Sequence, residues 1–257
     1  MVAAAVGMQV LGLVPFASTF AAFLTRAYDF IRMGAISQAN IRLSGSHAGV
    51  SIGEDGPSQM ALEDLAMMRA VFGSTVLYPC DANQTARLVA LMADRTGISY
   101  IRTTREKTPI LYLDGLDDFR IGGSRIVRGG GADDQVAVVA AGITVHEAVK
   151  AIDSLQGAVK VRLIDLYSVK PIDSKAIADA VRTTKGRLVV AEDHWPEGGI
   201  GDAVLAALAA AGMSDQLGHF VHLAPRRMPG SGKPAELLAA AGIDAAHIAD
   251  AVQGLAR

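Results

Sequence analysis

The chain has 257 residues, of which 51% are hydrophobic and 19% are charged, and its formal net charge is -2 at pH 7. These values are typical of one or two globular domains, and the near-neutral charge gives no reason to expect binding to nucleic acid or to a membrane surface. Cys80 is the single cysteine, which excludes an intramolecular disulfide and a multi-cysteine metal site and favours a reducing, cytoplasmic compartment.

The N-terminal region is strongly apolar, since no charged residue precedes Arg26. A secretory signal is disfavoured because no basic segment precedes the apolar run. A membrane span is disfavoured because Pro15 interrupts the run and the polar Ser18 and Thr19 follow soon after. We therefore expect this region to be part of a buried core.

The first part of the chain alternates between helical and strand patterns. The periodicity of apolar residues predicts strands at 13–17, 40–44, 74–78 and 98–103, and helices at 1–9, 20–33, 59–71 and 83–94. Such alternation is typical of parallel α/β packing. We interpret residues 1–112 as a first α/β domain.

A turn-rich stretch separates this domain from a second alternating series. We predict a linker at 113–134, which ends in the run GGGADD. The second series predicts strands at 135–141, 160–166, 187–191 and 220–224, and helices at 144–155, 174–183, 201–211, 234–241 and 244–255. Thr144 and Glu147 have the spacing of a capping box, and Asp173 is expected to cap the helix that follows it. The predicted fold class is α/β, with a second domain at 135–257 and two three-layer domains whose sheets are mostly parallel.

The stretch SHAGVSIGEDGPSQ at 46–59 is too rich in glycine for a helix or a strand. It contains His47, Asp55 and Gln59 but lacks the second histidine that a zinc site would need. The chain has no nucleophile-elbow, P-loop or dinucleotide-binding glycine pattern. The loop therefore offers hydrogen-bond donors and a carboxylate to a neutral, hydroxyl-rich ligand.

Arg105 follows a predicted strand, where open α/β sheets bind their ligands, so its guanidinium is well placed for a phosphate. Each of these residues also has an ordinary structural interpretation. His47 is equally an ordinary loop histidine, Asp55 a turn residue before glycine, and Arg105 a partner in a surface ion pair. Phe20 and Phe23, three residues apart, have the spacing of core positions on one helix face.

Long blocks of the sequence resemble the transketolase family, most closely its animal-type members. PFASTFAAFLTRAYD, GSHAGVSIGEDGPSQMALEDLAMMR and YIRTTRE resemble its pyrimidine-binding domain. DDQVAVVAAGITVHEAV, KGRLVVAEDHWPEGGIGDAV and SGKPAELL resemble its C-terminal domain. The resemblance implies that the chain corresponds to the C-terminal half of a thiamine diphosphate enzyme, which transfers a two-carbon ketol unit between sugar phosphates in the pentose phosphate pathway.

The resemblance also implies roles for the substrate residues. In the family, the histidine that matches His47 contacts the oxygens of the donor ketose. The acid that matches Asp55 binds a sugar hydroxyl, and the arginine that matches Arg105 binds the substrate phosphate.

Four further residues match the wall that surrounds the cofactor pyrimidine in the family. Phe23 corresponds to the ring that stacks on the aminopyrimidine, and Phe20 lines the same wall. Gln59 stands where some members have histidine, and is expected to bind the pyrimidine edge. Arg26 replaces a tyrosine of other branches, a departure shared with the animal type.

By the resemblance, the chain supplies only part of an active site. The family's catalytic glutamate lies in a Glu-Gln-Asn-Met block, and the sequence begins at the residue that matches the Met, so the glutamate would lie three residues before Met1. Glu54 lies in a different turn and is no substitute. The diphosphate-binding domain, which carries the ligands for Mg²⁺ or Ca²⁺, would come from a partner or from the missing N-terminal half, and the full enzyme is expected to be a homodimer. We thus expect no metal ligands in this chain and no ketol transfer by it alone.

Two alternatives remain open on the sequence. One is another thiamine diphosphate enzyme of the same fold, such as deoxyxylulose-phosphate synthase or a 2-oxoacid dehydrogenase β subunit. The loop at 46–59 and Arg105 favour sugar-phosphate transfer over both. The other alternative is a non-catalytic interaction module.

Overall fold

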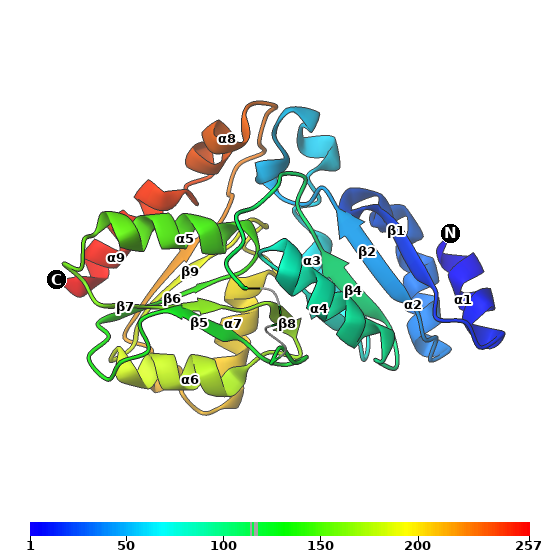
Figure 1. Ribbon diagram of the computed structural model, residues 1–257, viewed down its shortest axis with the longest axis horizontal. Coiled ribbons are helices and arrows are strands. Elements are labelled where there is room, and N and C mark those ends of the chain that lie inside the picture. The colour runs from blue at the N-terminus through cyan, green and yellow to red at the C-terminus, as the bar shows by residue number, and fades with distance from the viewer. Residues whose placement is uncertain (114, 116–117) are drawn as a thin grey trace.

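The framework consists of short strands of mainly apolar residues, and helices bury the side chains of these strands on both faces of each sheet. The computed structural model describes residues 1–113, 115 and 118–257, and its strands form two five-stranded sheets (Figure 1). The order of the first sheet is β1 (Phe16–Phe20), β2 (Arg42–Ser46), β4 (Ser99–Arg102), β3 (Thr75–Leu77) and β8 (Ser168–Lys170). The order of the second is β10 (His219–Leu223), β9 (Arg187–Ala191), β6 (Val136–Ala140), β7 (Val161–Asp165) and β5 (Arg125–Arg128).

Neighbouring strands are parallel in both sheets, except that the edge strands β8 and β5 are antiparallel to their neighbours. This arrangement confirms the predicted α/β class with mostly parallel sheets. Parallel strands need crossover connections, which the intervening helices provide.

Helices cover both faces of each sheet (Figure 1). The helices of the first domain are α1 (Val2–Val10), α2 (Tyr28–Ile36), α3 (Asp64–Ala70) and α4 (Ala82–Ala93), together with the 3₁₀ helices η1 (Ala21–Ala27), η2 (Val50–Asp55) and η3 (Pro57–Gln59). Those of the second are α5 (Ile143–Ser154), α6 (Ser174–Thr183), α7 (Ile200–Ala210), η4 (Ser214–Gln216), α8 (Pro234–Ala240) and α9 (Ala245–Ala256). α1, α2 and α3 share one hydrophobic core with the first sheet, whereas α4 packs on its other face. None of the described helices is both long and apolar enough to cross a lipid bilayer.

The N-terminal elements differ from the prediction in a way that matters for the site. β1 begins at Phe16 rather than at 13, because Gly12 turns the chain with a φ of 83° and Pro15 has no N–H to offer a strand ladder. The helix predicted at 20–33 is also wrong in its first half. That half is the 3₁₀ helix η1, in which the Thr25 hydroxyl donates to the carbonyl of Ala22 at 2.7 Å.

The helix predicted at 59–71 is interrupted, and α3 begins only at Asp64. Ala61 has a φ of 49°, which no α-helix contains. The carbonyls of Ala61 and Leu62 accept hydrogen bonds from Arg102 at 3.5 Å and from the N–H of Trp195 at 2.9 Å. Partners distant in sequence therefore override the local helical pattern.

Of the predicted helix caps, one is wrong and one is confirmed. Gly142, not Thr144, is the N-cap of α5, and the Thr144 hydroxyl donates instead to the carbonyl of Ala191 at 2.8 Å. The Asp173 side chain accepts the N–H of Ala176 at 3.1 Å and caps α6 as expected. The first cap is lost because the end of β9, in the second sheet, lies within hydrogen-bond distance of the Thr144 hydroxyl.

The two domains share structure across their junction. Strand β8 belongs to the second domain in sequence but forms the edge of the first sheet, next to β3. Lys170 of this strand donates to the carbonyls of Arg69 at 2.8 Å and Val71 at 2.7 Å, which lie at the C-terminal end of α3. The division at 112 and 134 stays a prediction, although β5 shows that the expected linker contains regular structure.

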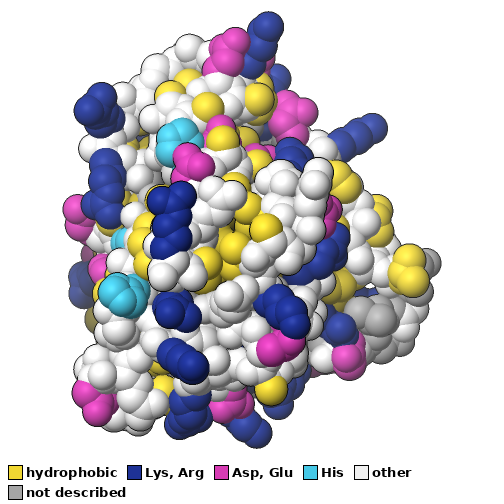
Figure 2. All heavy atoms as spheres, turned by 90° about the vertical axis from the view of Figure 1, so that its left-hand side faces the viewer, with side chains coloured by type: hydrophobic (Ala, Val, Ile, Leu, Met, Phe, Trp, Pro, Cys, Tyr) yellow, Lys and Arg dark blue, Asp and Glu magenta, His cyan; other side chains and the backbone are white. Residues whose placement is uncertain are grey.

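The outer end of the second domain, on the left of Figure 1, is displayed in Figure 2. Lys and Arg side chains are spread over this face with Asp and Glu between them, and hydrophobic side chains lie in small areas among them (Figure 2). This mixture agrees with the net charge of -2.

A buried carboxyl group of the second domain binds residues of the first domain. The carboxylate of Asp165 accepts hydrogen bonds from the Tyr112 hydroxyl at 2.7 Å and from the Gln84 amide at 2.7 Å, and Cys80 lies 3.6 Å away. Burial raises the pKa of Asp165 to about 6, although the hydrogen bonds from Tyr112 and Gln84 act in the opposite direction. The same burial, together with the charge of Asp165, raises the pKa of the Cys80 thiol, which is unreactive for this reason.

We expect Asp165 to make stability depend on pH. A carboxyl whose pKa is higher in the folded than in the unfolded chain stabilises the fold fully below the unfolded value, and this stabilisation is lost as the pH rises through about 6. Relative to Asp165→Asn, the unmodified chain should gain about 2 kcal/mol of unfolding free energy between about pH 7.5 and 4.5. Urea unfolding of both proteins at the two pH values measures this difference. The exposed Asp179→Asn is the control, and an equal difference at both values contradicts the assignment.

Candidate active site at the carboxyl ends of the first sheet

Three adjacent parallel strands bring the predicted site segments to one edge of the first sheet. Phe20 ends β1 and is in register with Ser46 at the end of β2, directly before His47. Gly45 of β2 is in register with Arg102 at the end of β4, and Arg105 follows three residues later. Ligands of open α/β sheets bind at this edge, so the topology itself points to a site here.

Four of the predicted residues form one stacked series. The Phe20 ring lies between His47, at 3.9 Å with an angle of 12° between the rings, and Phe23, at 5.4 Å with an angle of 8°. The guanidinium of Arg26 lies 5.7 Å from the centre of the Phe23 ring. His47 has a φ of 56°, and its Nδ1 is 3.1 Å from the Ser46 hydroxyl. The rings are thus arranged to present flat surfaces at the strand ends.

A hollow of about 380 Å³ lies at the Phe23 end of this series. It is lined by Met1, Val2, Ala3, Thr19, Phe23, Leu24, Arg26, Ala27 and Phe30. The Phe23 ring is 38% exposed, so it offers a free apolar surface to a planar ligand.

The other two predicted substrate residues form a charged cluster. A terminal nitrogen of Arg105 lies 3.1 Å from the carboxylate of Glu54 and 3.8 Å from that of Asp55, and it donates to the carbonyl of Ile52 at 3.2 Å. All three side chains are accessible to water. A guanidinium bound this loosely to carboxylates is free to exchange them for a phosphate.

Gln59 lies at the end of η3, which packs beside η1, the helix of Phe23 and Arg26. Its side chain is half-buried, and within residues 1–113, 115 and 118–257 it has no hydrogen-bond partner. The amide is therefore free to bind a ligand edge. The assignments of all seven predicted residues stay predictions; the structure brings four of them into one ring series and two into one charged cluster, and it places Gln59 on a helix that contacts η1.

The loop that carries Asp55 is fixed by the second domain. The carboxylate of Asp193 accepts the N–H groups of Val50 at 2.7 Å and of Ser51 at 3.3 Å. Gly49 has a φ of 94°, and a Cβ there would collide with this carboxylate. Burial raises the pKa of Asp193, an effect that Arg102 and these backbone donors oppose.

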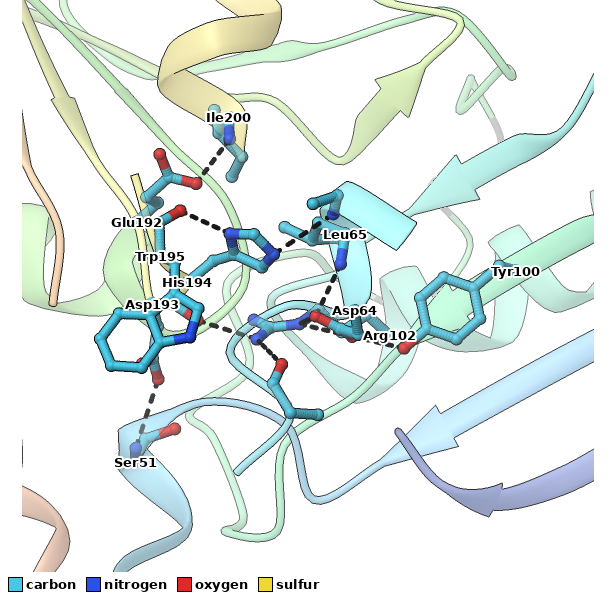
Figure 3. Close-up of polar contacts among 12 residues, drawn as sticks. Ser51, Asp64, Leu65, Tyr100, Arg102, Glu192, Asp193, His194, Trp195 and Ile200 are labelled. Carbon is cyan, nitrogen blue, oxygen red and sulfur yellow. Dashed lines mark hydrogen bonds and ion pairs between the residues drawn. The ribbon is translucent and has the colours of Figure 1, made fainter. Parts of the chain in front are cut away.

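A buried ion pair lies beneath the site, and Figure 3 displays it. The side chains of Arg102 and Asp64 are fully buried, with Arg102 Nε 2.9 and 3.0 Å from the two carboxylate oxygens. Tyr100 donates its hydroxyl to Asp64, and Arg102 donates to the carbonyl of Asp193 at 2.8 Å (Figure 3). Burial alone would lower the pKa of Arg102, but the charge of Asp64 outweighs it, and the pKa is raised. Arg102 therefore stays charged.

His194 also connects the domains. Its Nε2 accepts the N–H of Ala66 at 3.3 Å, and its Nδ1 donates to the carbonyl of Trp195 at 2.6 Å (Figure 3). The sequence analysis did not predict the buried group formed by Arg102, Asp64, Asp193 and His194. A charged Arg102 within the predicted strand 98–103 was one available signal, because a central strand tolerates a charge only with a buried partner.

Comparisons with known proteins agree with this architecture. Residues 1–110 match the family described as "Transketolase, pyrimidine binding domain", and residues 125–248 match "Transketolase, C-terminal domain". The chain is 52% identical over 244 residues to transketolase of Homo sapiens, which covers 94% of this chain and 38% of that protein. It is 51% identical over 256 residues to transketolase-like protein 1 of Bos taurus, covering 98% of this chain and 42% of that protein. The chain thus spans about two fifths of the length of these curated relatives.

Two solved structures have the same fold. One is described as "Split gene transketolase, inactive beta4 tetramer", with a TM-score of 0.87 and 32% identity, over 99% of this chain and 80% of that one. The other, a transketolase from Leishmania mexicana, has a TM-score of 0.75 over 95% of this chain and 34% of that one. Its identity is 22%, so this likeness shows the fold alone.

The fold and the strand-end site define a two-domain α/β protein of the transketolase-like class. The chain belongs to the transketolase family, and it corresponds to a C-terminal half of its animal members.

The Arg102–Asp64 pair yields a stability prediction. Asp64→Asn leaves a buried arginine without its counter-charge, so we expect a loss of roughly 3–5 kcal/mol of unfolding free energy. The matched control is Asp29→Asn, which breaks the exposed pair between Asp29 and Arg32 and should cost less than about 1 kcal/mol. Urea unfolding followed by the fluorescence of Trp195, the only tryptophan, measures both. Equal losses contradict the assignment of the buried pair.

Proposed function

We propose that this chain provides the pyrimidine-binding wall and the sugar-phosphate site of a transketolase. The whole enzyme would transfer a two-carbon ketol unit between ketose and aldose phosphates, using thiamine diphosphate, in the cytoplasmic pentose phosphate pathway. The observation that carries the proposal is the geometry at one sheet edge. There, a stacked ring series and an acid–arginine cluster occupy the ends of β1, β2 and β4 in a member of this family.

The residues present fit the pyrimidine end of the cofactor. The free Phe23 surface suits stacking against a flat heterocycle, and Phe20 supports that ring from behind. The amide of Gln59 and the guanidinium of Arg26 are the polar groups that would bind the edge of the heterocycle. When bound, thiamine diphosphate supplies the centre that stabilises the carbanion of the transferred unit.

The substrate groups would divide the work of binding. Stacking on Phe20 and the contact with Ser46 fix the His47 ring, so that its Nε2 is available to an oxygen of the donor ketose. The carboxylate of Asp55 would accept a hydrogen bond from a sugar hydroxyl. Arg105 would bind the phosphate, which replaces the carboxylate of Glu54 as its partner.

The remaining parts of the site would come from the segment that carries the catalytic glutamate, directly before the residue that matches Met1, and from a diphosphate-binding domain, which carries the ligands for Mg²⁺ or Ca²⁺. The relatives are more than twice as long as this chain, which supports such a division. The structure titled as an inactive β4 tetramer of a split-gene transketolase supports the expectation that a chain of this kind is inactive without its counterpart. The assembled enzyme would be a dimer about this shared site.

Reconstitution tests the proposal. The chain is mixed with the part of human transketolase that precedes the matched 244-residue segment, and turnover of xylulose 5-phosphate with ribose 5-phosphate is followed with thiamine diphosphate and Mg²⁺. We expect turnover in the mixture only. An associated but inactive mixture contradicts the proposed function, and turnover by the chain alone contradicts the division of the site.

A variant of Arg105 tests the phosphate role. Because a charge-assisted hydrogen bond contributes about 1.5–3 kcal/mol, Arg105→Gln should raise KM for the phosphorylated donor by about 10- to 100-fold. Activity with a donor that lacks phosphate should change little. Arg182→Gln, which alters an exposed arginine on α6, is the control and should leave both values unchanged. An equal loss with both donors would show that Arg105 does not bind phosphate.

A further inference from the structure

The segment Glu192–Trp195 follows β9 in the second domain and reaches into the first domain (Figure 3). Glu192, Asp193 and His194 are fully buried. Asp193 accepts the first two N–H groups of η2 with its carboxylate, and it accepts a hydrogen bond from Arg102 with its carbonyl. One residue of the second domain therefore binds both segments that carry the proposed substrate groups.

These contacts lie close in sequence to the substrate groups. Val50, whose N–H meets Asp193, is three residues after His47, and Ser51 is four residues before Asp55. Arg102 is three residues before Arg105.

A further bond closes the arrangement. The hydroxyls of Ser51 and Thr104 lie 3.1 Å apart and join η2 to the segment that carries Arg105. The 3₁₀ helix η2 is short and contains Gly53 with a φ of 82°, so its own backbone constrains it little. External hydrogen bonds must fix its position.

We propose that Asp193 is a positioning residue for sugar-phosphate binding: through η2 and Arg102, the second domain sets the relative placement of His47, Asp55 and Arg105. This inference rests on the proposed function. It assigns the second domain a part in substrate affinity, although none of the proposed cofactor or substrate residues belongs to that domain.

Glu192 provides a matched control within the same segment. Its carboxylate is equally buried and also accepts two neighbouring backbone N–H groups, those of Ile200 at 2.5 Å and Gly201 at 2.9 Å. It also contacts His222 Nε2 at 2.5 Å. All of these partners lie in the second domain, so Glu192→Gln disturbs the fold to a similar degree without touching η2.

Hydrogen exchange of the complete chain measures the positioning without any assay of activity. In Asp193→Asn, the side-chain NH₂ group faces a backbone donor, so one hydrogen bond to η2 is lost. We expect amide exchange in 49–55 to become about 10-fold faster or more, with exchange in 199–204 unchanged. Glu192→Gln should give the reverse pattern. Unchanged exchange in 49–55 of Asp193→Asn overturns the proposal.

Kinetics of the reconstituted enzyme provide the second readout. Asp193→Asn should raise KM for the phosphorylated donor about 10-fold while kcat stays within about 3-fold, whereas Glu192→Gln should leave KM unchanged. Parallel losses of kcat in both variants with an unchanged KM overturn the proposal. An inactive unmodified enzyme would instead contradict the proposed function, and the exchange experiment would still decide whether Asp193 positions η2.

A milder variant covers the case in which Asp193→Asn does not fold. Ser51→Ala removes the bond to Thr104 and the side-chain hydrogen bond from Ser51 to Asp193, and it leaves no buried charge without a partner. It should raise KM for the phosphorylated donor by about 3-fold and accelerate amide exchange in residues 49–55, because η2 loses the hydrogen bonds of the Ser51 hydroxyl. If Ser51→Ala changes neither quantity, the linkage from η2 to Arg105 is refuted.

Discussion

The buried charge of Arg102 constrains the structure more than any other single group. A guanidinium in the middle of a protein is tolerated only where counter-charge and hydrogen-bond acceptors surround it. Asp64 of α3 provides the charge, Asp193 of the second domain provides a carbonyl, and the Tyr78 ring lies 4.5 Å from the guanidinium carbon. Because these partners come from both domains, separating the domains would leave a charge in the interior with fewer partners. The domain junction and the end of β4 are fixed together.

This constraint explains the form of the loops at the sheet edge. The carbonyl of Ala61 accepts from Arg102 of β4, and that of Leu62 accepts from Trp195 of the second domain, so the chain does not enter α3 before Asp64. The interruption leaves η3, which ends at Gln59, as a separate short helix beside η1, the helix of Phe23 and Arg26. A continuous helix from 59 would have placed that amide differently. The local break is therefore a consequence of the junction and a condition for the proposed binding wall.

The sequence predicted the parts of the fold that local patterns encode. Alternating apolar runs predicted the strands, with β9 at 187–191 as found, and Asp173 was predicted as a cap because its partner lies three residues away. Predictions failed where a distant partner decides. The Thr144 hydroxyl donates to the carbonyl of Ala191 on β9, and the carbonyl of Ala61 accepts a hydrogen bond from Arg102. The proposed site residues came from family resemblance, since neither periodicity nor spacing distinguishes Phe20 and Phe23 from core residues. Asp193 and His194 have no local signature at all.

The split-gene structure adds an argument about the relative placement of the two domains. Its TM-score of 0.87 extends over 99% of this chain, so it includes both domains in their relative placement, at only 32% identity. The relative placement of the two domains is therefore common to both chains. The antiparallel strand β8 completes the first sheet from the second domain, and Lys170 on it bonds to carbonyls at the end of α3. The two domains therefore share a sheet and a hydrogen-bonded junction, through which a substitution in one domain can affect the strand-end site of the other.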